Sequence, residues 1–114
     1  MSQCVFCRIV SGELPATFLY EDDGVVAFPD LHPAAPTHVL VVPRRHVASL
    51  ADDAADDQDL LGRLLLAAAE VARRLGIAAT GYRIVINTGP QAGQLVPHLH
   101  LHLLAGRELG WPPG

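Results

Sequence analysis

Three of the six histidines in this 114-residue chain fall within five residues, as His98-Leu99-His100-Leu101-His102. Side chains of a β-strand alternate between its two faces, so a strand here would place the imidazoles on one face and the leucines on the other. Neighbouring imidazoles would then lie about 6.5–7 Å apart. Gathering three potential cations in this way favours a site of chemistry over a solvated polar face in which histidine recurs by chance.

Two kinds of chemistry suit such a face. Histidines two residues apart on a strand can share a catalytic zinc ion. Alternatively, one neutral imidazole can attack phosphorus while its neighbours donate to the phosphate or the leaving group. The polar, glycine-punctuated segment 87–94 runs into the histidines, and its backbone N–H groups can bind an anion. This loop favours the second chemistry, in which a histidine is the nucleophile at a bound phosphate.

The hydropathy pattern predicts the elements that must position these groups. A short helix is predicted over Val5–Val10, where apolar residues recur at helical spacing before Ser11-Gly12. Apolar and β-branched runs predict strands over residues 18–21, 25–28, 37–42, 82–86 and 99–104. Turn residues separate the first two runs, and a proline-containing loop over residues 30–36 precedes the third.

A long helix is predicted after residue 52. Asp52 or Asp53 is the expected N-cap, and Gly76 is the expected end. Apolar residues recur every three or four positions and predict one buried face, made of Leu60, Leu61, Leu64, Leu65, Ala68, Val71, Ala72 and Leu75. Five strands and one long helix in hairpin-like order predict an α+β domain with a mainly antiparallel sheet over residues 1–114.

Composition narrows the function classes. The net charge of −4 and the absence of a basic stripe argue against a nucleic-acid polymer as partner. No run of about 18 apolar residues suggests a membrane span, and Met1–Cys4 shows no pattern of a secretory leader, so a cytoplasmic location is expected. A disulfide between Cys4 and Cys7 is then disfavoured, which leaves a metal-binding pair or two small buried side chains.

The run His98–Leu104 is similar to the signature of the histidine triad (HIT) superfamily, in which three histidines alternate with apolar residues. Three further segments resemble the Hint branch of that superfamily: Tyr20–Asp23, Ala35–His38 and the ending Gly106-Arg107 … Trp111–Gly114. The resemblance covers nearly the whole chain. It implies a homodimer in which two five-stranded sheets join into a ten-stranded sheet.

The resemblance also implies an activity and a ligand. The expected activity is hydrolysis of purine nucleoside phosphoramidates or acyl-nucleotides through a nucleotidyl-histidine intermediate, with a nucleoside monophosphate such as AMP bound. His100 would be the nucleophile, His102 would contact the phosphate and assist the leaving group, and His38 and His98 would support them. The remaining binding residues implied are Asp30 for the ribose, Phe6, Ile9, Phe28 and Leu31 for the base, Asn87, Gly93 and Val96 for the phosphate, and Trp111 for the partner's site.

Several of these residues have plainer interpretations from the sequence. Phe28 and Ile9 are equally suited to the hydrophobic core. Asp30 follows a predicted strand and can be a turn residue, although the resemblance favours contact with the ribose. Two positions depart from the resemblance, because Leu95 replaces a residue that is commonly polar and Ala105 replaces a glycine. Leucine cannot donate a hydrogen bond, so slower turnover or a different choice of leaving group is expected.

The cysteine pair resembles a feature of many bacterial members of the superfamily, where it holds zinc together with two histidines. The corresponding residues here are Cys4, Cys7, His46 and His98, a closed set typical of structural zinc. Three alternatives to the phosphoramidate activity stay open. These are hydrolysis of dinucleoside polyphosphates, a nucleotide-binding scaffold dimer with negligible turnover, and a zinc hydrolase that uses the triad directly.

Overall fold

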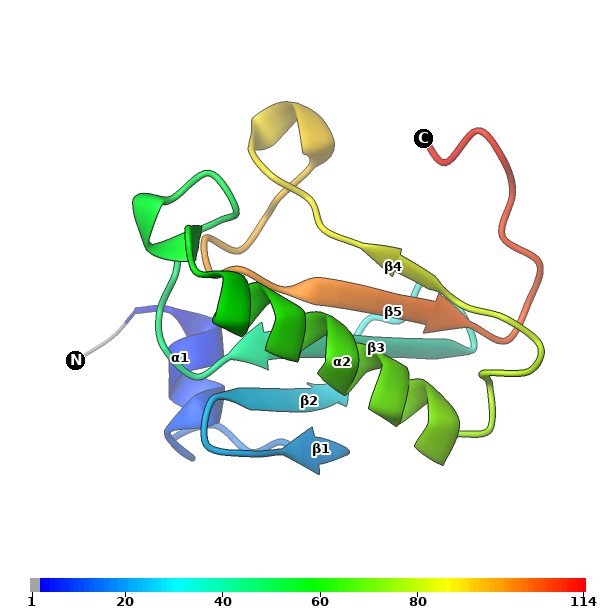
Figure 1. The fold of residues 1–114 in the computed structure, drawn as a ribbon, viewed down its shortest axis with the longest axis horizontal. Coiled ribbons are helices and arrows are strands. Elements are labelled where there is room, and N and C mark those ends of the chain that lie inside the picture. Colours follow the sequence, from blue (N-terminus) through cyan, green and yellow to red (C-terminus); the bar gives the residue numbers. More distant parts are fainter. Residues whose placement is uncertain (1–2) are drawn as a thin grey trace.

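The strand order β1-β2-β3-β5-β4 defines the architecture in the computed structural model, which describes residues 3–114 (Figure 1). Every neighbouring pair in this described five-stranded sheet is antiparallel, which confirms the predicted α+β fold class. The strands are β1 (Tyr20–Glu21), β2 (Val25–Pro29), β3 (Thr37–Pro43), β4 (Arg83–Val85) and β5 (Leu101–Ala105). The expectation of no leader concerned Met1 and Ser2 in part, and these two residues lie outside the described part of the chain.

Two α-helices accompany the sheet, α1 (Val5–Val10) and α2 (Gln58–Arg74), together with the short 3₁₀ helices η1 (Asp53–Ala55) and η2 (Pro90–Ala92). The predicted N-cap of the long helix was wrong. Asp52 caps η1, and the α2 cap is Asp57, whose side chain accepts a hydrogen bond from the Leu60 N–H. The 3₁₀ turn intervenes because Asp56 leaves the helical conformation, which delays the start of α2. No helix within residues 3–114 is long and apolar enough to cross a membrane.

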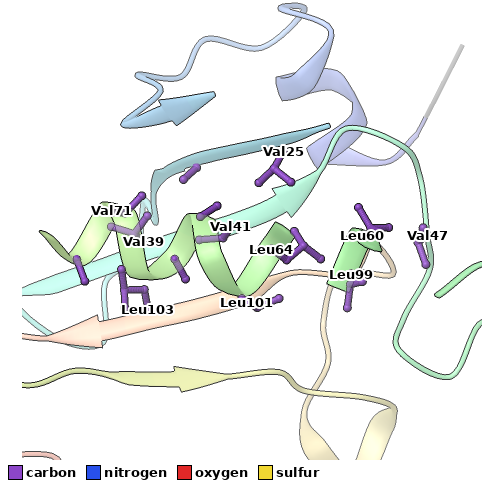
Figure 2. Close-up of a cluster of buried hydrophobic side chains, with 14 of the residues drawn as sticks. Val25, Val39, Val41, Val47, Leu60, Leu64, Val71, Leu99, Leu101 and Leu103 are labelled. Atoms are coloured by element: carbon purple, nitrogen blue, oxygen red, sulfur yellow. The ribbon is translucent and has the colours of Figure 1, made fainter. Parts of the chain in front are cut away.

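The helix α2 covers one face of the sheet and closes the larger of two apolar clusters (Figure 1). Its buried residues are Leu60, Leu64, Ala67, Ala68, Val71 and Ala72. They meet side chains from the central strands, and Figure 2 shows Val39, Val41, Leu101 and Leu103 beneath Leu64 and Val71. Leu65 and Leu75 were predicted to share this face, but 47% and 42% of their surface is exposed, because the buried stripe is narrower than the sequence pattern suggested.

A second, smaller cluster occupies the opposite face of the sheet. Phe6 of α1 packs there with Phe28 of β2 and Leu40 of β3, and Ile9 lies at its margin. Val25 and Ala27 belong to the first cluster, whereas Val26 and Phe28 belong to the second, as the alternation of a strand requires. β2 is therefore buried on both faces, and α1 is brought against the face that carries the histidines.

The segment with the histidines enters the sheet later than predicted. β5 begins at Leu101, so His98 and His100 precede the regular ladder. The backbone N–H of Leu99 instead donates to the carbonyl of Val47, in the loop after β3, at 2.6 Å. Alternation nevertheless continues through this irregular stretch, since Leu99 is only 1% exposed and belongs to the same cluster as Leu101 and Leu103.

Candidate active site

The three histidine rings form a row on the face of the sheet opposite α2, in which the ring of Phe6 lies against both His98 and His100. The ring centroids of His100 and His102 are 4.9 Å apart. The ring of Phe6 contacts both His98 and His100 edge-on, with centroid distances of 5.8 and 5.1 Å. His98 and His100 are buried, at 0% and 7% exposure, and His102 is half-buried. The predicted alternation therefore produces a histidine row that is largely shielded from water.

A backbone hydrogen bond determines which nitrogen of His100 carries the proton. Its Nδ1 lies 2.7 Å from the carbonyl oxygen of His98. A carbonyl only accepts hydrogen bonds, so Nδ1 must be the protonated nitrogen. In the neutral imidazole the lone pair then belongs to Nε2, which is the form of histidine that acts as a nucleophile.

A chain of two hydrogen bonds sets the proton positions in His38 and His102. The backbone N–H of Ala34 donates to Nδ1 of His38, so the proton of a neutral His38 lies on Nε2. That nitrogen is 2.9 Å from Nδ1 of His102, to which it donates. The remaining nitrogen of His102, Nε2, then carries a proton, which makes it a donor toward a bound phosphate or leaving group.

Asp30 follows β2 and lies beside this pair. One carboxylate oxygen accepts the backbone N–H of His32, and the other is 3.5 Å from Nε2 of His38. Asp30, His38 and His102 have donor atoms within 4.8 Å of one another, as a metal site requires. Binding a metal would remove the proton from His38 Nε2 and place one on Nδ1, opposite the Ala34 N–H. The hydrogen bonds therefore favour a proton-bearing pair over a metal site.

A cavity of about 750 Å³ opens beside the row. Phe6, which lines the cavity, contacts His100 of the row, and Asp30 contacts His38, the hydrogen-bond partner of His102. The predicted binding residues among its lining are Phe6, Ile9, Phe28, Asp30, Leu31 and Val96. Phe28 is buried at 3% exposure and also belongs to the smaller core cluster, so the alternatives of core and pocket both hold for this residue.

The loop over residues 87–96 is held by Gln94, a residue that no sequence pattern singled out. Its side-chain amide donates to the carbonyls of Ala48 and Val96 at 2.9 and 3.0 Å, and its oxygen accepts the Gly89 N–H. Gly89 and Gly93 adopt positive φ angles of 84° and 80° at the two ends of η2. The sequence shows only a glutamine directly after Gly93, able to donate and accept at once, and no local pattern identifies its partner Ala48.

Three predicted residues do not line the cavity. Asn87 and Gly93 belong to the loop that precedes the histidines, Asn87 half-buried and Gly93 exposed. Trp111 lies in the C-terminal tail with 82% of its surface exposed. Its implied role concerns a partner's site and stays a prediction. Leu95, in contrast, lines the cavity although it is 91% exposed.

The second candidate cluster joins the N-terminus to the histidine row. Donor atoms of Cys4, Cys7, His46 and His98 lie within 4.8 Å of one another. Nδ1 of His98 is 3.3 Å from Cys4 Sγ and 3.5 Å from Cys7 Sγ, and Nδ1 of His46 is 3.3 Å from Cys7 Sγ. The other nitrogen of His98 donates to the Pro43 carbonyl at 2.9 Å, which leaves the Nδ1 lone pair directed to the sulfurs. Two thiols and two imidazoles in this arrangement are close enough to hold a metal ion.

Burial keeps two of the histidines neutral. The pKa of His102 is lowered to about 4, mainly by desolvation and also by the charges of the nearby His100 and His38, against the opposing effect of Asp30. Desolvation also lowers the pKa of His98, against the opposing effect of its hydrogen bond to the Pro43 carbonyl. Near neutral pH both rings are uncharged, in agreement with the hydrogen bonds described above.

Comparison with known proteins agrees with this geometry. Residues 11–109 match the HIT domain family, and the chain belongs to that family. An uncharacterized HIT-like protein of Synechococcus elongatus is 51% identical over 110 residues, which cover 96% of each chain. A HIT family hydrolase from Legionella pneumophila has 46% identity and a TM-score of 0.94, over 98% of this chain and 100% of that chain. A histidine triad nucleotide-binding protein from Candida albicans has 32% identity and a TM-score of 0.83, over 96% and 83% of the two chains.

The depressed pKa of His102 predicts a loss of stability on acidification. Unfolded His102 takes up a proton near its ordinary pKa of 6.5, whereas the folded protein resists protonation down to about pH 4. The unfolded state therefore binds more protons across this window, and the free energy of unfolding falls as pH is lowered from 6.5 to 4. Urea titrations at several pH values, with a chelator present, measure this slope. His102→Gln should flatten it, and an unchanged slope in that variant would contradict the assignment.

Proposed function

We propose that this protein hydrolyses purine nucleoside phosphoramidates or acyl-nucleotides at the α-phosphorus, with His100 as the nucleophile. The observation that carries the proposal is the hydrogen bond from His100 Nδ1 to the His98 carbonyl. This bond leaves the Nε2 lone pair available for attack. The family of the chain, the hydrolase name of its Legionella relative and the nucleotide-binding name of its Candida relative support the same chemistry.

The reaction would take two steps at one phosphorus atom. In the first step, His100 Nε2 forms a bond to the α-phosphorus while the bond from phosphorus to the leaving group breaks. A carboxylate departs as an anion with that electron pair, whereas an amine takes up a proton from solvent as the bond breaks and departs neutral. In the second step, a water oxygen bonds to phosphorus, the Nε2–phosphorus bond breaks, the water proton goes to solvent and the nucleoside monophosphate is released. His102 Nε2–H would donate a hydrogen bond to the phosphate as its charge builds.

The cavity beside the row suits the nucleoside. Its volume of about 750 Å³ falls within the range of small-molecule sites, and aromatic and aliphatic side chains dominate its lining. Phe6, Ile9, Phe28 and Leu31 would contact the base, whereas the free acceptor positions of the Asp30 carboxylate suit the ribose hydroxyls. The half-buried amide of Asn87 and the backbone near Gly93 and Val96 would surround the phosphate.

Replacing His100 by alanine should abolish turnover, because no other group in the row has the same tautomer and carbonyl partner. We expect a loss of at least about 1,000-fold in the release of AMP from adenosine 5′-phosphoramidate, followed by chromatography. Wild-type protein should also form a covalent nucleotidyl adduct that mass spectrometry detects and the variant lacks. A second variant, His100→Gln, provides the control, because calorimetry should show that it still binds the product AMP.

Other outcomes would favour other functions. Full activity of the His100 variant would refute the assignment of the nucleophile. A strong preference for diadenosine polyphosphates would favour the dinucleoside polyphosphate hydrolase. Tight AMP binding without hydrolysis of any substrate would favour a scaffold, which the exposed, non-donating side chain of Leu95 supports.

We also propose that Cys4, Cys7, His46 and His98 bind a structural zinc ion. The set supplies two sulfurs and two nitrogens, the ligands typical of closed tetrahedral sites. Zinc bound there would join α1 to the loop after β3 and to the histidine row. It would supply a fixed cross-link and no activated water, because a closed set of four protein ligands is typical of structural sites.

Removing the metal should lower stability while nucleotide chemistry remains possible. Bound zinc stabilises the folded chain by about 2.7 kcal/mol when its free concentration is 100 times the dissociation constant. Thermal unfolding with and without a chelator measures this difference, and elemental analysis should find one zinc per chain. Cys4→Ser should lose both effects. If chelation instead abolished turnover and left the unfolding temperature unchanged, the triad would be a catalytic zinc site.

The homodimer implied by the resemblance has support on the surface of the described chain. Helix α2 exposes Leu65 and Leu66 at 47% and 70%, and Tyr82 at 37% precedes the edge strand β4. Unpaired strand edges and apolar side chains are typical of surfaces that bind a second copy. Joining two β4 edges would continue the sheet to ten strands. Sedimentation equilibrium should report twice the chain mass, and a monomer at micromolar concentration would refute this assembly.

A further inference from the structure

We infer that the Cys4–Cys7–His46–His98 cluster and the nucleotide site are energetically coupled, so that a metal ion at one strengthens binding at the other. This inference rests on the proposed nucleotide binding and the proposed metal binding. Two independent connections carry it. One runs through the backbone and side chain of His98, and the other runs through the helix α1.

His98 contacts both sites with different atoms. Its ring nitrogen Nδ1 faces the sulfurs of Cys4 and Cys7, at 3.3 and 3.5 Å. Its carbonyl oxygen accepts the proton of His100 Nδ1 at 2.7 Å. The residue is fully buried, and its other ring nitrogen is bound to the Pro43 carbonyl. A ring fixed by a metal therefore restrains the carbonyl that orients His100, because a buried residue cannot move one part independently of the other.

The helix α1 connects the same two sites. Cys4 caps it, Cys7 lies within it, and the Sγ of Cys4 accepts the Cys7 N–H at 3.4 Å. Between these two residues lies Phe6, whose ring contacts His98 and His100 and lines the nucleotide cavity. Six residues are too few for an independently stable helix, so its position depends on its tertiary contacts. Metal binding through both cysteines would hold Phe6 and Ile9 against the cavity.

A metal-free chain would have to order α1 and His98 when the nucleotide binds. In a metal-loaded chain α1 and His98 are already ordered, so nucleotide binding loses less conformational entropy and is tighter. Linkage requires the reverse effect to be equal, and the nucleotide must raise the metal affinity by the same factor. His98 and Phe6 act here as positioning residues, since neither needs to touch the metal and the phosphate together.

Two titrations of the full-length protein test the coupling. Calorimetry measures the AMP affinity of chelator-stripped protein and of protein with one equivalent of Zn²⁺. Competition with a chromophoric chelator measures the Zn²⁺ affinity with and without saturating AMP. We expect both affinities to rise by one common factor of at least about five-fold. A change below two-fold in these titrations would overturn the coupling.

Variants at two neighbouring phenylalanines test whether the coupling runs through the ring of Phe6. Phe6→Leu removes the ring contacts to His98 and His100, so it should keep its Zn²⁺ affinity without AMP but lower the factor to the part that the connection through His98 supplies. Phe28→Leu is the matched control, because Phe28 lines the cavity and contacts Phe6 but makes no ring contact with these histidines among the described residues. It should weaken AMP binding and keep the factor. A full factor in Phe6→Leu would overturn the role of Phe6.

The same measurements distinguish failure of the coupling from failure of the proposed function. A chain that binds AMP and Zn²⁺ independently would refute the coupling and leave the nucleotide hydrolase intact. A chain that binds no AMP in either state would refute both. In the double variant Cys4→Ser with Cys7→Ser, Zn²⁺ should leave the AMP affinity unchanged, and an increase there would show that the effect arises elsewhere.

Discussion

Burial of three alternate leucines beneath α2 is the constraint on which the rest of the structure depends. Leu99, Leu101 and Leu103 are at most 1% exposed, and each contributes roughly 1.5–3 kcal/mol through burial. Because side chains of an extended chain alternate, burying these leucines directs His98, His100 and His102 to the opposite face. The stability of the fold and the position of its chemistry therefore share a single physical cause.

On the face that carries the histidines, backbone groups supply hydrogen-bond partners for the buried imidazole nitrogens. A buried ring nitrogen without a partner is costly, yet a catalytic nitrogen must keep one position available. Backbone groups resolve this conflict, since the carbonyls of Pro43 and His98 accept from His98 and His100. His38 instead accepts a hydrogen bond, because the backbone N–H of Ala34 donates to its Nδ1. Each of these three rings consequently has one nitrogen bound to the backbone and the other directed toward a neighbour or a ligand.

The α-helices α1 and α2 differ in length and in what they cover. The helix α2 has 17 residues and covers the larger core, but none of its residues lines the cavity beside the histidine row. The helix α1 has six residues and contributes Phe6 and Ile9 to that cavity. A short element next to the site is a suitable place for a metal cross-link, since its own hydrogen bonds hold it weakly. The long helix that covers the larger core and the short helix beside the cavity therefore lie on opposite faces of one sheet.

The sequence alone determined the features that depend on local periodicity and residue chemistry. These include the strands near residues 25–28 and 37–42, the mainly antiparallel sheet, the helix Val5–Val10 and the alternation at His98–His102. The spacing of Cys4 and Cys7 indicated a metal-binding pair but left two small buried side chains as the alternative. Family resemblance extended this to residues such as Asp30, which local pattern leaves open between a turn and a binding role.

Only the tertiary structure decided what depends on contacts between distant segments. The proton positions of His98 and His102 follow from Pro43 and His38, which lie 55 and 64 residues away from them in the chain. The cap of α2, the positioning role of Gln94 and the exposure of Leu65 were likewise beyond sequence reasoning. A periodic pattern specifies which face a side chain takes, but a hydrogen bond also requires a particular distance and direction, and these exist only after the chain has packed.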